Sequence, residues 1–540
     1  MGGSTRTPLQ VSAVAVVVML ASTLTAFASV FGLFFFILIR IKGLEHVIIH
    51  YRWVFVCLCL LPASALYDLI FYLRNGFIFY SKSAPKQHDA RVEEIQQQVR
   101  NWHTGGRLRR MCTARPGWLT ISFRTPLYKQ SLNAIRINLM DILEVNTEKR
   151  TVYAEPLVTM GQLTATLNPL GYTLPVIPEL DDLTLGGLIM GVGIETSSHI
   201  YGLFQETVVS VEMVLQDGSR VRCSKDENSE LFMAVPWSHG SLGFLVAAEI
   251  RIIPARRYVK LEYFPAYSAA EFTDLFAEKS LERDKNHFVE GILYTKDSGV
   301  VMTGSMTDSA ESGKENSIGH YWKPWFYKHV ESFLKKRITG IEYIPLRHYY
   351  HRHTKSIFWM LHNIIPFGNH PAFRYLLGWM VPPKVSFLKL TQGETIRRLY
   401  EERQMIQDML VPLAHLRKSI DYFDKEIDLY PLWFCPFWLP SRPGFLHPAS
   451  MEGDGEMYVD IGAYGEPLSP NFKFRASTRK LETFVRENNG FQMLYADSYM
   501  TAEEFRGMFD HTLYDKMRRD LDCVKAFPDI YEKTNRNARY

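Results

Sequence analysis

Thr184-Leu185-Gly186-Gly187-Leu188-Ile189-Met190-Gly191-Val192-Gly193-Ile194-Glu195-Thr196 is the stretch of this 540-residue chain that decides its fold. It holds four glycines, and most of its other side chains are apolar. Glycine has no Cβ, so the backbone N–H groups of such a run can approach a large anion closely. Pro175 and Pro178 precede the run and stiffen its entry. Bare amides after a rigid entry suit the pyrophosphate of a dinucleotide.

The run differs from the dinucleotide fingerprint G-x-G-x-x-G of Rossmann folds. Thr196 stands where the third glycine would be, and the run does not clearly follow the first strand of a βαβ unit. A Rossmann fold is therefore disfavoured. A glycine-rich packing loop without a ligand stays open as an alternative.

Composition limits the class of protein. With 47% hydrophobic and 13% aromatic residues, the chain can bury the cores of two or more domains and is not disordered. The net charge of +4 is small and its basic residues are scattered, so no nucleic-acid partner is expected. The six cysteines form no C-x-x-C pair, and His348, His351 and His353 have no cysteine or carboxylate among them. We therefore predict no metal site.

The N-terminal part, residues 1–80, is predicted to be a membrane anchor. Residues 11–39 carry no charge, and residues 53–73 form a second apolar segment broken by Pro62 and Asp68. A single span, a hairpin of two spans and a cleaved signal remain open, because basic residues flank both segments. Residues 81–110 follow as an exposed linker helix, with apolar residues at 92, 95 and 99.

Local patterns then divide the chain into domains at 111–255, 256–480 and 481–540. In the first we expect strands at 135–139 and 118–123, a strand pair at 141–146 and 151–156, and a helix at 160–170 ended by Gly171. Asp217-Gly218 predicts a hairpin between 208–215 and 219–223, and 244–253 reads as a further strand. In the second domain, residues 397–410 are expected to be helical.

The order of motifs in the first domain resembles a known family. Arg115-Pro116-Gly117-Trp118, the glycine run and the segment Gly240-Ser241-Leu242-Gly243-Phe244-Leu245-Val246 follow one another as in the FAD-binding domain of the vanillyl-alcohol-oxidase, or PCMH-type, flavoproteins. Longer stretches, among them 138–145, 179–184, 343–354 and 490–497, resemble the delta(24)-sterol reductase (Diminuto-like) group. The resemblance runs from about Lys42 to the end of the chain.

This resemblance implies an α+β fold: a PCMH-type FAD-binding domain, a substrate domain with an antiparallel sheet, and a C-terminal segment, 481–540, that completes the active site. It implies that FAD is held by Thr184 to Thr196, by Arg115 to Trp118, and by Gly240, Gly243 and Val246. Some members of the superfamily attach FAD through a histidine of the early loop. Residues 112–122 contain no histidine, so we expect the FAD to be non-covalent.

The resemblance further implies that NADPH drives reduction of the C24=C25 side-chain bond of a sterol, in the membrane of the endoplasmic reticulum or Golgi, with the catalytic part facing the cytosol. Other enzymes of sterol biosynthesis are implied partners. That isolated alkene needs a proton donor in a dry pocket, and Tyr495 and His348 are the candidates, with a structural role open for each. The rival functions are a flavin oxidase or dehydrogenase of the aldonolactone-oxidase type and a membrane-tethered sterol-binding scaffold without catalysis.

Overall fold

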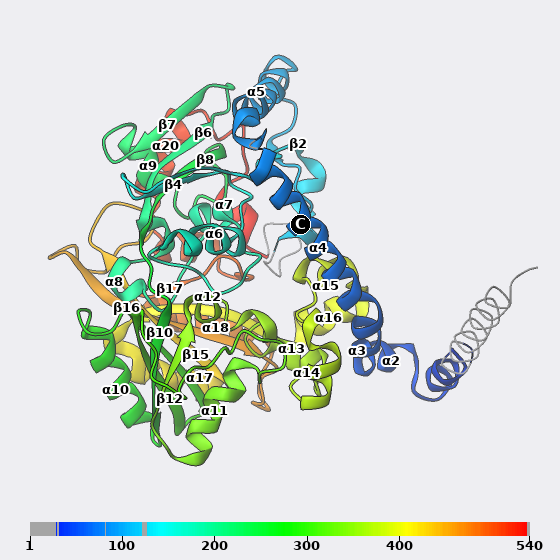
Figure 1. Ribbon diagram of the computed structural model, residues 1–540. Helices are drawn as coiled ribbons and strands as arrows, with labels where there is room; N and C mark the ends of the chain where they lie inside the picture. Colours follow the sequence, from blue (N-terminus) through cyan, green and yellow to red (C-terminus); the bar gives the residue numbers. More distant parts are fainter. Residues whose placement is uncertain (1–28, 30–31, 82, 121–126, 537–540) are drawn as a thin grey trace, which may run out of the picture.

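The computed structural model describes residues 29, 32–81, 83–120 and 127–536. The predicted apolar segment 11–39 lies outside these residues over 11–28 and 30–31, as do residues 121–123 of the predicted strand 118–123. Two antiparallel sheets, one above the other in Figure 1, form the centres of two α/β layers. The expected combination of an α+β FAD-type domain with an antiparallel substrate domain matches this arrangement.

The smaller sheet has the strand order β3-β4-β8-β6-β7. Its strands are β3 (Ile142–Asn146), β4 (Thr151–Ala154), β6 (Val208–Val214), β7 (Arg220–Ser224) and β8 (Phe244–Arg251). The predicted strand pair and the Asp-Gly hairpin are both confirmed, since β3 pairs with β4 and β6 with β7, each antiparallel. Two short pairs flank this sheet: β1 (Met111–Thr113) with β2 (Asn133–Ile135), and β5 (Tyr172–Thr173) with β9 (Ile253–Pro254).

The helices of this layer are mostly short. They are α5 (Ser83–Thr104), α6 (Met160–Leu167), α7 (Leu185–Met190), α8 (Ser198–Tyr201) and α9 (Ser229–Ala234), with 3-10 turns η2 (Gly117–Leu119), η3 (Leu127–Ser131), η4 (Asn168–Leu170) and η5 (Phe204–Thr207). A capping box at Thr159 starts α6. Gly171 follows η4 at φ 78° and ends this helical stretch, as the sequence predicted.

The larger sheet has the order β13-β10-β12-β11-β15-β16-β14-β17. Its strands are β10 (Tyr258–Ala266), β11 (Phe288–Thr295), β12 (Ser298–Thr307), β13 (Gly340–Pro345), β14 (Met405–Pro412), β15 (Leu432–Pro440), β16 (Gly455–Gly465) and β17 (Phe491–Gln492). Helices α10 (Ala269–Leu281), α11 (Phe326–Lys336), α17 (Leu416–Glu426) and α18 (Phe474–Glu487) belong to this layer.

Short helices and 3-10 turns connect the strands of the larger sheet. They are α12 (Leu346–Tyr350), α13 (Met360–Ile364), α14 (Pro371–Leu377), α15 (Val385–Leu390), α16 (Glu394–Arg403), η6 (Thr354–Ser356), η7 (Gly378–Met380) and η8 (Leu413–His415).

The C-terminal segment serves both layers. β17 extends the larger sheet by pairing with β14, while α20 (Thr512–Asp520) packs on α9 beside the smaller one. Helices α19 (Ala502–Met508) and α21 (Ile530–Thr534) complete this segment.

Four local predictions were wrong. The predicted strand 118–123 does not begin as a strand, since Trp118 and Leu119 belong to the 3-10 turn η2. Residues 405–410 form part of strand β14 and only 394–403 are helical, because the buried apolar run after Arg403 pairs with β16. The predicted strand at 135–139 ends at Ile135. The linker helix α5 is not simply exposed, since Val92, Ile95 and Val99 are buried against the body.

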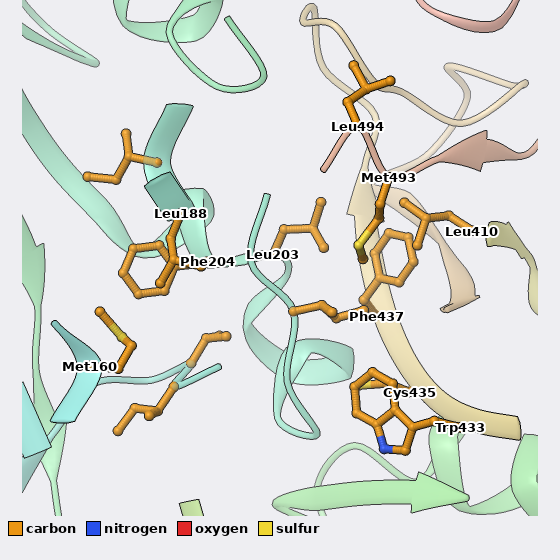
Figure 2. Packing of buried hydrophobic residues seen from close by; sticks show 14 of the residues in the cluster. Met160, Leu188, Leu203, Phe204, Leu410, Trp433, Cys435, Phe437, Met493 and Leu494 are labelled. Atoms are coloured by element: carbon orange, nitrogen blue, oxygen red, sulfur yellow. The ribbon is translucent and has the colours of Figure 1, made fainter. Parts of the chain in front are cut away.

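The two layers share one core. The buried apolar cluster includes Met160, Leu188 and Phe204 from the smaller layer and Leu410, Phe437 and Met493 from the larger one. Figure 2 shows these two groups on either side of Leu203. Because apolar side chains from both layers pack together, we infer that the layers form one folded unit.

The N-terminal helices lie along one edge of this unit (Figure 1). They are α2 (Leu44–His50), α3 (Arg52–Phe55), the π-helical turn η1 (Val56–Leu60) and α4 (Leu61–Ser81). Among the described residues, one helical stretch, Arg52–Phe77, is long and apolar enough to cross a membrane.

Candidate active site

A cavity of about 480 Å³ lies where the two layers meet. The glycine run and the loop at Gly240 line one part of it. Strands β14, β15 and β16 line another part through Asp408, Trp433 and Tyr464. The cavity is therefore built by both layers.

The glycine run forms the short helix α7 and the turn after it. A Cβ on Gly186 would come within 2.8 Å of the Cβ of Pro156, and one on Gly193 within 2.7 Å of the Cβ of Phe204. A Cβ on Gly191 would meet the carbonyl oxygen of Gly187 at 2.6 Å. The run therefore tolerates no side chain at these three positions, where its backbone packs closely on neighbouring segments. We call the part of the cavity lining that the run forms the glycine wall.

Most of the predicted cofactor residues line this cavity: Thr184, Gly186, Gly187, Leu188, Met190, Gly191, Val192, Gly193, Ile194, Arg115, Gly240 and Gly243. Leu185, Ile189 and Val246 are instead buried in the core, and Pro116, Gly117 and Trp118 lie in or beside the turn η2. Glu195 and Thr196, at the end of the run, are fully buried behind the cavity.

Three cationic side chains surround the glycine wall. The Arg115 guanidinium donates to the carbonyl oxygen of Leu119 at 2.9 Å, and the Lys129 ammonium donates to that of Arg115 at 2.9 Å. The Lys533 ammonium donates to the carbonyl oxygens of His239 and Gly240 at 2.9 and 3.0 Å. Burial lowers the pKa of all three, that of Lys533 to about 7. Cations are costly to bury, and an anion bound beside these three groups would offset that cost.

Strand β14 brings a carboxyl group to the cavity. Asp408 is buried and accepts a hydrogen bond from the hydroxyl of Tyr464, 2.5 Å away, on the neighbouring strand β16. The hydroxyl of Tyr495 is a second hydrogen-bond partner of this carboxyl group. Burial raises the pKa of Asp408, and it raises the pKa of Tyr464 and Tyr495 well above the usual value. This group of three thus holds protons in an apolar setting.

A second carboxyl group lies behind the first. Asp408 is opposite Gly462 and Asp460 is opposite Leu410 in the β14–β16 register, so the two aspartates point to the same face of the sheet. Asp460 is fully buried, and neither of its carboxyl oxygens has a hydrogen-bond partner among the described residues. Burial and the charge of Asp408 raise its pKa well above the usual value. We infer that Asp460 stays protonated.

An ion network ties the end of the glycine run to the larger layer. The Arg352 guanidinium contacts the carboxylates of Glu195 and Glu290 at 2.8 Å each, and all three side chains are fully buried. Trp433 donates from its indole to Glu290 at 3.0 Å. The charge of Arg352 keeps the pKa of Glu290 below its usual value although burial opposes this. Glu195 therefore has a structural partner rather than a place in the cavity wall.

The structure separates the two proton-donor candidates. Tyr495 lines the cavity, whereas His348 is not among its lining residues. The His348 ring lies 5.2 Å from that of His320 and against Gly319, whose added Cβ would meet it at 2.5 Å. Burial lowers the pKa of His348 to about 4. Its two neighbours are also engaged, His351 with Thr164 and His353 with Glu290.

Sequence reasoning missed four cavity residues that carry chemistry: Lys129, Lys533, Asp408 and Tyr464. One signal was available, because the polar pair Gln407-Asp408 separates the apolar residues Met405-Ile406 from the apolar run Met409 to Leu413. The sequence around Lys533 gave no such signal, since nothing in it indicates that the C-terminal segment returns to the loop at Gly240.

The residues present fit FAD. The backbone of the glycines beside Arg115, Lys129 and Lys533 matches a pyrophosphate, which needs close approach and positive charge. The apolar remainder of the cavity leads to Asp408 and Tyr495. A flat ring system and an apolar substrate would both find contacts there.

Comparison with known proteins agrees with this site. The FAD binding domain family matches residues 109–224. The chain is 59% identical to the human delta(24)-sterol reductase, over 95% of this chain and 99% of that protein. It is 40% identical to the delta(24)-sterol reductase of Arabidopsis thaliana, over 91% of this chain and 92% of that protein.

A more distant likeness is confined to one part of the chain. The L-gulonolactone oxidase of Scyliorhinus torazame is 31% identical over 24% of this chain and 30% of that protein. The reductases, by contrast, match over more than nine tenths of the chain, which includes both layers and the cavity between them. The chain therefore belongs to the delta(24)-sterol reductase family.

Proposed function

We propose that this protein is an FAD-dependent, NADPH-driven oxidoreductase that reduces the C24=C25 side-chain double bond of sterol intermediates, of which desmosterol is one, in sterol biosynthesis. The observation that carries the proposal is the single cavity that joins the glycine wall to the Asp408–Tyr464–Tyr495 group. The similarity to sterol reductases over nearly the whole chain supports the substrate class.

FAD supplies the chemistry of hydride transfer when it is bound, with NADPH as the source of electrons. Arg115, Lys129 and Lys533 would hold the pyrophosphate against the backbone of Gly187 and Gly191. We propose non-covalent FAD, which denaturation in acid would release into the supernatant.

The chain must supply a proton as well. The C24=C25 bond is conjugated to no carbonyl, so it does not accept hydride unless positive charge develops on it. Transfer of a proton to C24 uses the π electrons to form the C24–H bond and places that charge on the tertiary C25, where hydride then forms the second C–H bond. NADPH is oxidised to NADP⁺, and one proton is taken up.

We assign this proton to the Asp408–Tyr464–Tyr495 group. Tyr495 lines the cavity, and its hydroxyl is hydrogen-bonded to a carboxyl group that burial keeps protonated more readily than usual. A proton given up by the Tyr495 hydroxyl can be replaced from Asp408. The rings of Trp433, Phe358 and Tyr464 also line the cavity, where aromatic faces stabilise a developing cation and exclude water.

The test is an anaerobic titration of the full-length protein in detergent. Flavin absorbance that bleaches with NADPH and returns with desmosterol supports both half-reactions. Absorbance that returns only with air contradicts the proposal and favours an oxidase, the function named for the shorter match. Protein without flavin absorbance contradicts it as well and favours a sterol-binding scaffold.

We also propose that the protein acts at an endomembrane, the endoplasmic reticulum or Golgi, with both layers in the cytosol and with other sterol-biosynthesis enzymes nearby. A cytosolic position would give the cavity access to NADPH. The long apolar helix Arg52–Phe77 and the uncharged segment 11–39 support membrane attachment. Protease protection of sealed microsomes tests the orientation, since cleavage of the body without detergent is expected.

A further inference from the structure

Large apolar side chains are exposed mainly along one side of the molecule. Among the described residues, most of them fall in two segments, 33–77 and 367–390. On the helix Arg52–Phe77 the most exposed are Leu58, Leu66, Ile70, Tyr72, Leu73 and Phe77. On α14, η7 and α15 they are Tyr375, Leu376, Trp379 and Leu390. Figure 1 shows α4 running beside α15 and α16, with α14 near its lower end.

The opposite side of the helix is fixed to the protein over nearly its whole length. The Trp53 ring lies 5.0 Å from that of Phe367, and the Tyr67 ring lies 5.7 Å from that of Phe387. Between them, Ser64 accepts a hydrogen bond from the backbone of Lys384 at 2.8 Å. The side chains of Val56, Leu60 and Leu61 on this side are buried.

Charged side chains also hold the helix to the protein, near both of its ends and at its middle. Arg52 donates to the Tyr400 hydroxyl at 2.9 Å, and Arg74 pairs with Asp141 at 3.4 Å. In the middle, the Lys384 ammonium contacts Asp68 and Asp182 at 2.7 Å each. A helix that crossed the bilayer would draw these ion pairs and the loops that carry them into hydrocarbon, where exposed charges and irregular backbone are very costly.

We propose that the helix Arg52–Phe77 lies in the plane of the lipid surface and, together with Tyr375, Leu376, Trp379 and Leu390, forms a docking face for a bilayer. We call these residues the docking face. Because one side of this apolar helix packs on the protein, only the other side is free for lipid. A helix lying in the interface buries its apolar side roughly 5–10 Å into the boundary between headgroups and acyl chains. Tyr72, Tyr375 and Trp379 are of the residue types that favour that boundary. Arg40 and Lys42, both exposed, precede the helix and suit anionic headgroups.

The docking face adjoins the cavity. Helix α15 lies between them: Val385 lines the cavity, while Phe387 packs on Tyr67 of the docking helix. Lys389 ties α15 to η2 by donating to the carbonyl oxygens of Gly117 and Thr120 at 3.0 Å. An apolar substrate dissolved in the bilayer would thus have one helix between it and the cavity. Resting on the proposed function, we infer that the sterol enters from the lipid at α15.

Topology is the first test, made on the full chain in sealed microsomes. Cys59 is exposed, whereas the other five cysteines are buried. Cys59→Ser is therefore the parent protein into which the single cysteines below are introduced. Glu45→Cys precedes the docking helix and Glu94→Cys follows it, and both positions are exposed. An in-plane helix predicts that a membrane-impermeant maleimide labels both without detergent. Labelling of Glu45→Cys only after detergent would overturn the proposal, because the helix would then span.

The second test separates docking from catalysis. Leu376→Glu/Trp379→Glu places charges on the docking face outside the helix, and Leu468→Glu is a matched control at a similarly exposed leucine. With sterol supplied in phosphatidylcholine–phosphatidylserine vesicles, we expect kcat/KM to fall about tenfold or more in the double variant and not in the control. With sterol in detergent micelles, we expect all three proteins to be equal.

The outcomes are distinguishable from failure of the proposed function. Equal loss in vesicles and micelles, or no loss in either, contradicts the docking face. A wild-type protein that reduces no sterol even in micelles contradicts the proposed function instead, while the labelling result still decides whether the helix lies in plane.

Discussion

Asp408 is the residue on which the proposed chemistry depends most. It lies in a buried strand, faces the cavity, and has tyrosine hydroxyls from β16 and from the 490–497 segment as partners. A carboxyl group in such a position stays neutral to a higher pH than in water, since burial disfavours its charged form. That property is what a donor to an isolated alkene requires.

We expect Asp408→Asn to slow reoxidation of the reduced flavin by desmosterol about 100-fold or more, the usual effect of losing a general acid. Reduction by NADPH should be unchanged. Tyr495→Phe should leave FAD bound and slow the same step. Single-turnover absorbance measurements check both variants, and an unchanged rate in Tyr495→Phe would remove that hydroxyl as the donor.

The pH dependence has a definite sign. Burial raises the pKa of Asp408 to about 6, and only its protonated form can replace the proton that Tyr495 gives up, so the sterol half-reaction should be fastest below that pH and slow as pH rises through it. In Asp408→Asn this fall should vanish. A wild-type rate that instead rises with pH over this range would contradict the assignment.

At the scale of elements, helix α21 stabilises the loop at Gly240, which lies beside the glycine wall. A capping box at Asp529 fixes the start of this short helix, and Lys533, near its end, reaches the carbonyl oxygens of His239 and Gly240. Gly240 has φ +71°, a left-handed conformation that glycine adopts without strain. The C-terminal segment thereby supports a loop that lies about 300 positions earlier in the chain.

We expect Lys533→Met to weaken FAD binding roughly ten- to a hundredfold, the effect of losing one charge-assisted hydrogen bond of about 1.5–3 kcal/mol. Methionine is shorter than lysine only by the terminal ammonium group and keeps most of the packing of the side chain. Quenching of FAD fluorescence by the apoprotein measures the affinity. Lys525→Met, at an exposed lysine of the same segment, is the control and should bind FAD as the wild type does.

Local elements were predictable where turn chemistry fixed them. Asp217-Gly218 defined the β6–β7 hairpin and Gly171 the end of η4, because each needs only its own neighbours. The strand β14 was not predictable in this way, since a short buried run reads alike as helix or strand. Half of the site was therefore visible in the glycine run, whereas Asp408 and Lys533 join it only through sheet pairing and the return of the C-terminus.

At the scale of the whole molecule, the Arg352 network joins the two layers behind the cavity. Glu195 ends the glycine run, Glu290 belongs to β11, and Arg352 binds both without access to solvent. Removing one member of such a network leaves buried charge without compensation, whereas an exposed pair contributes little. Since the layers also share one apolar core, loss of a member of this network should lower the stability of both layers.

We therefore expect Arg352→Met to lower the free energy of unfolding by roughly 3–5 kcal/mol, because two buried carboxylates lose their shared cation. Arg256→Met is the matched control: Arg256 pairs with Asp308 at the surface, where both side chains are more than half exposed, and its loss should cost less than about 1 kcal/mol. Thermal unfolding, monitored in the same experiment by flavin release and by circular dichroism, measures the effect. If the layers are one unit, both signals shift together in Arg352→Met; a shift of flavin release alone would mean that the smaller layer unfolds by itself.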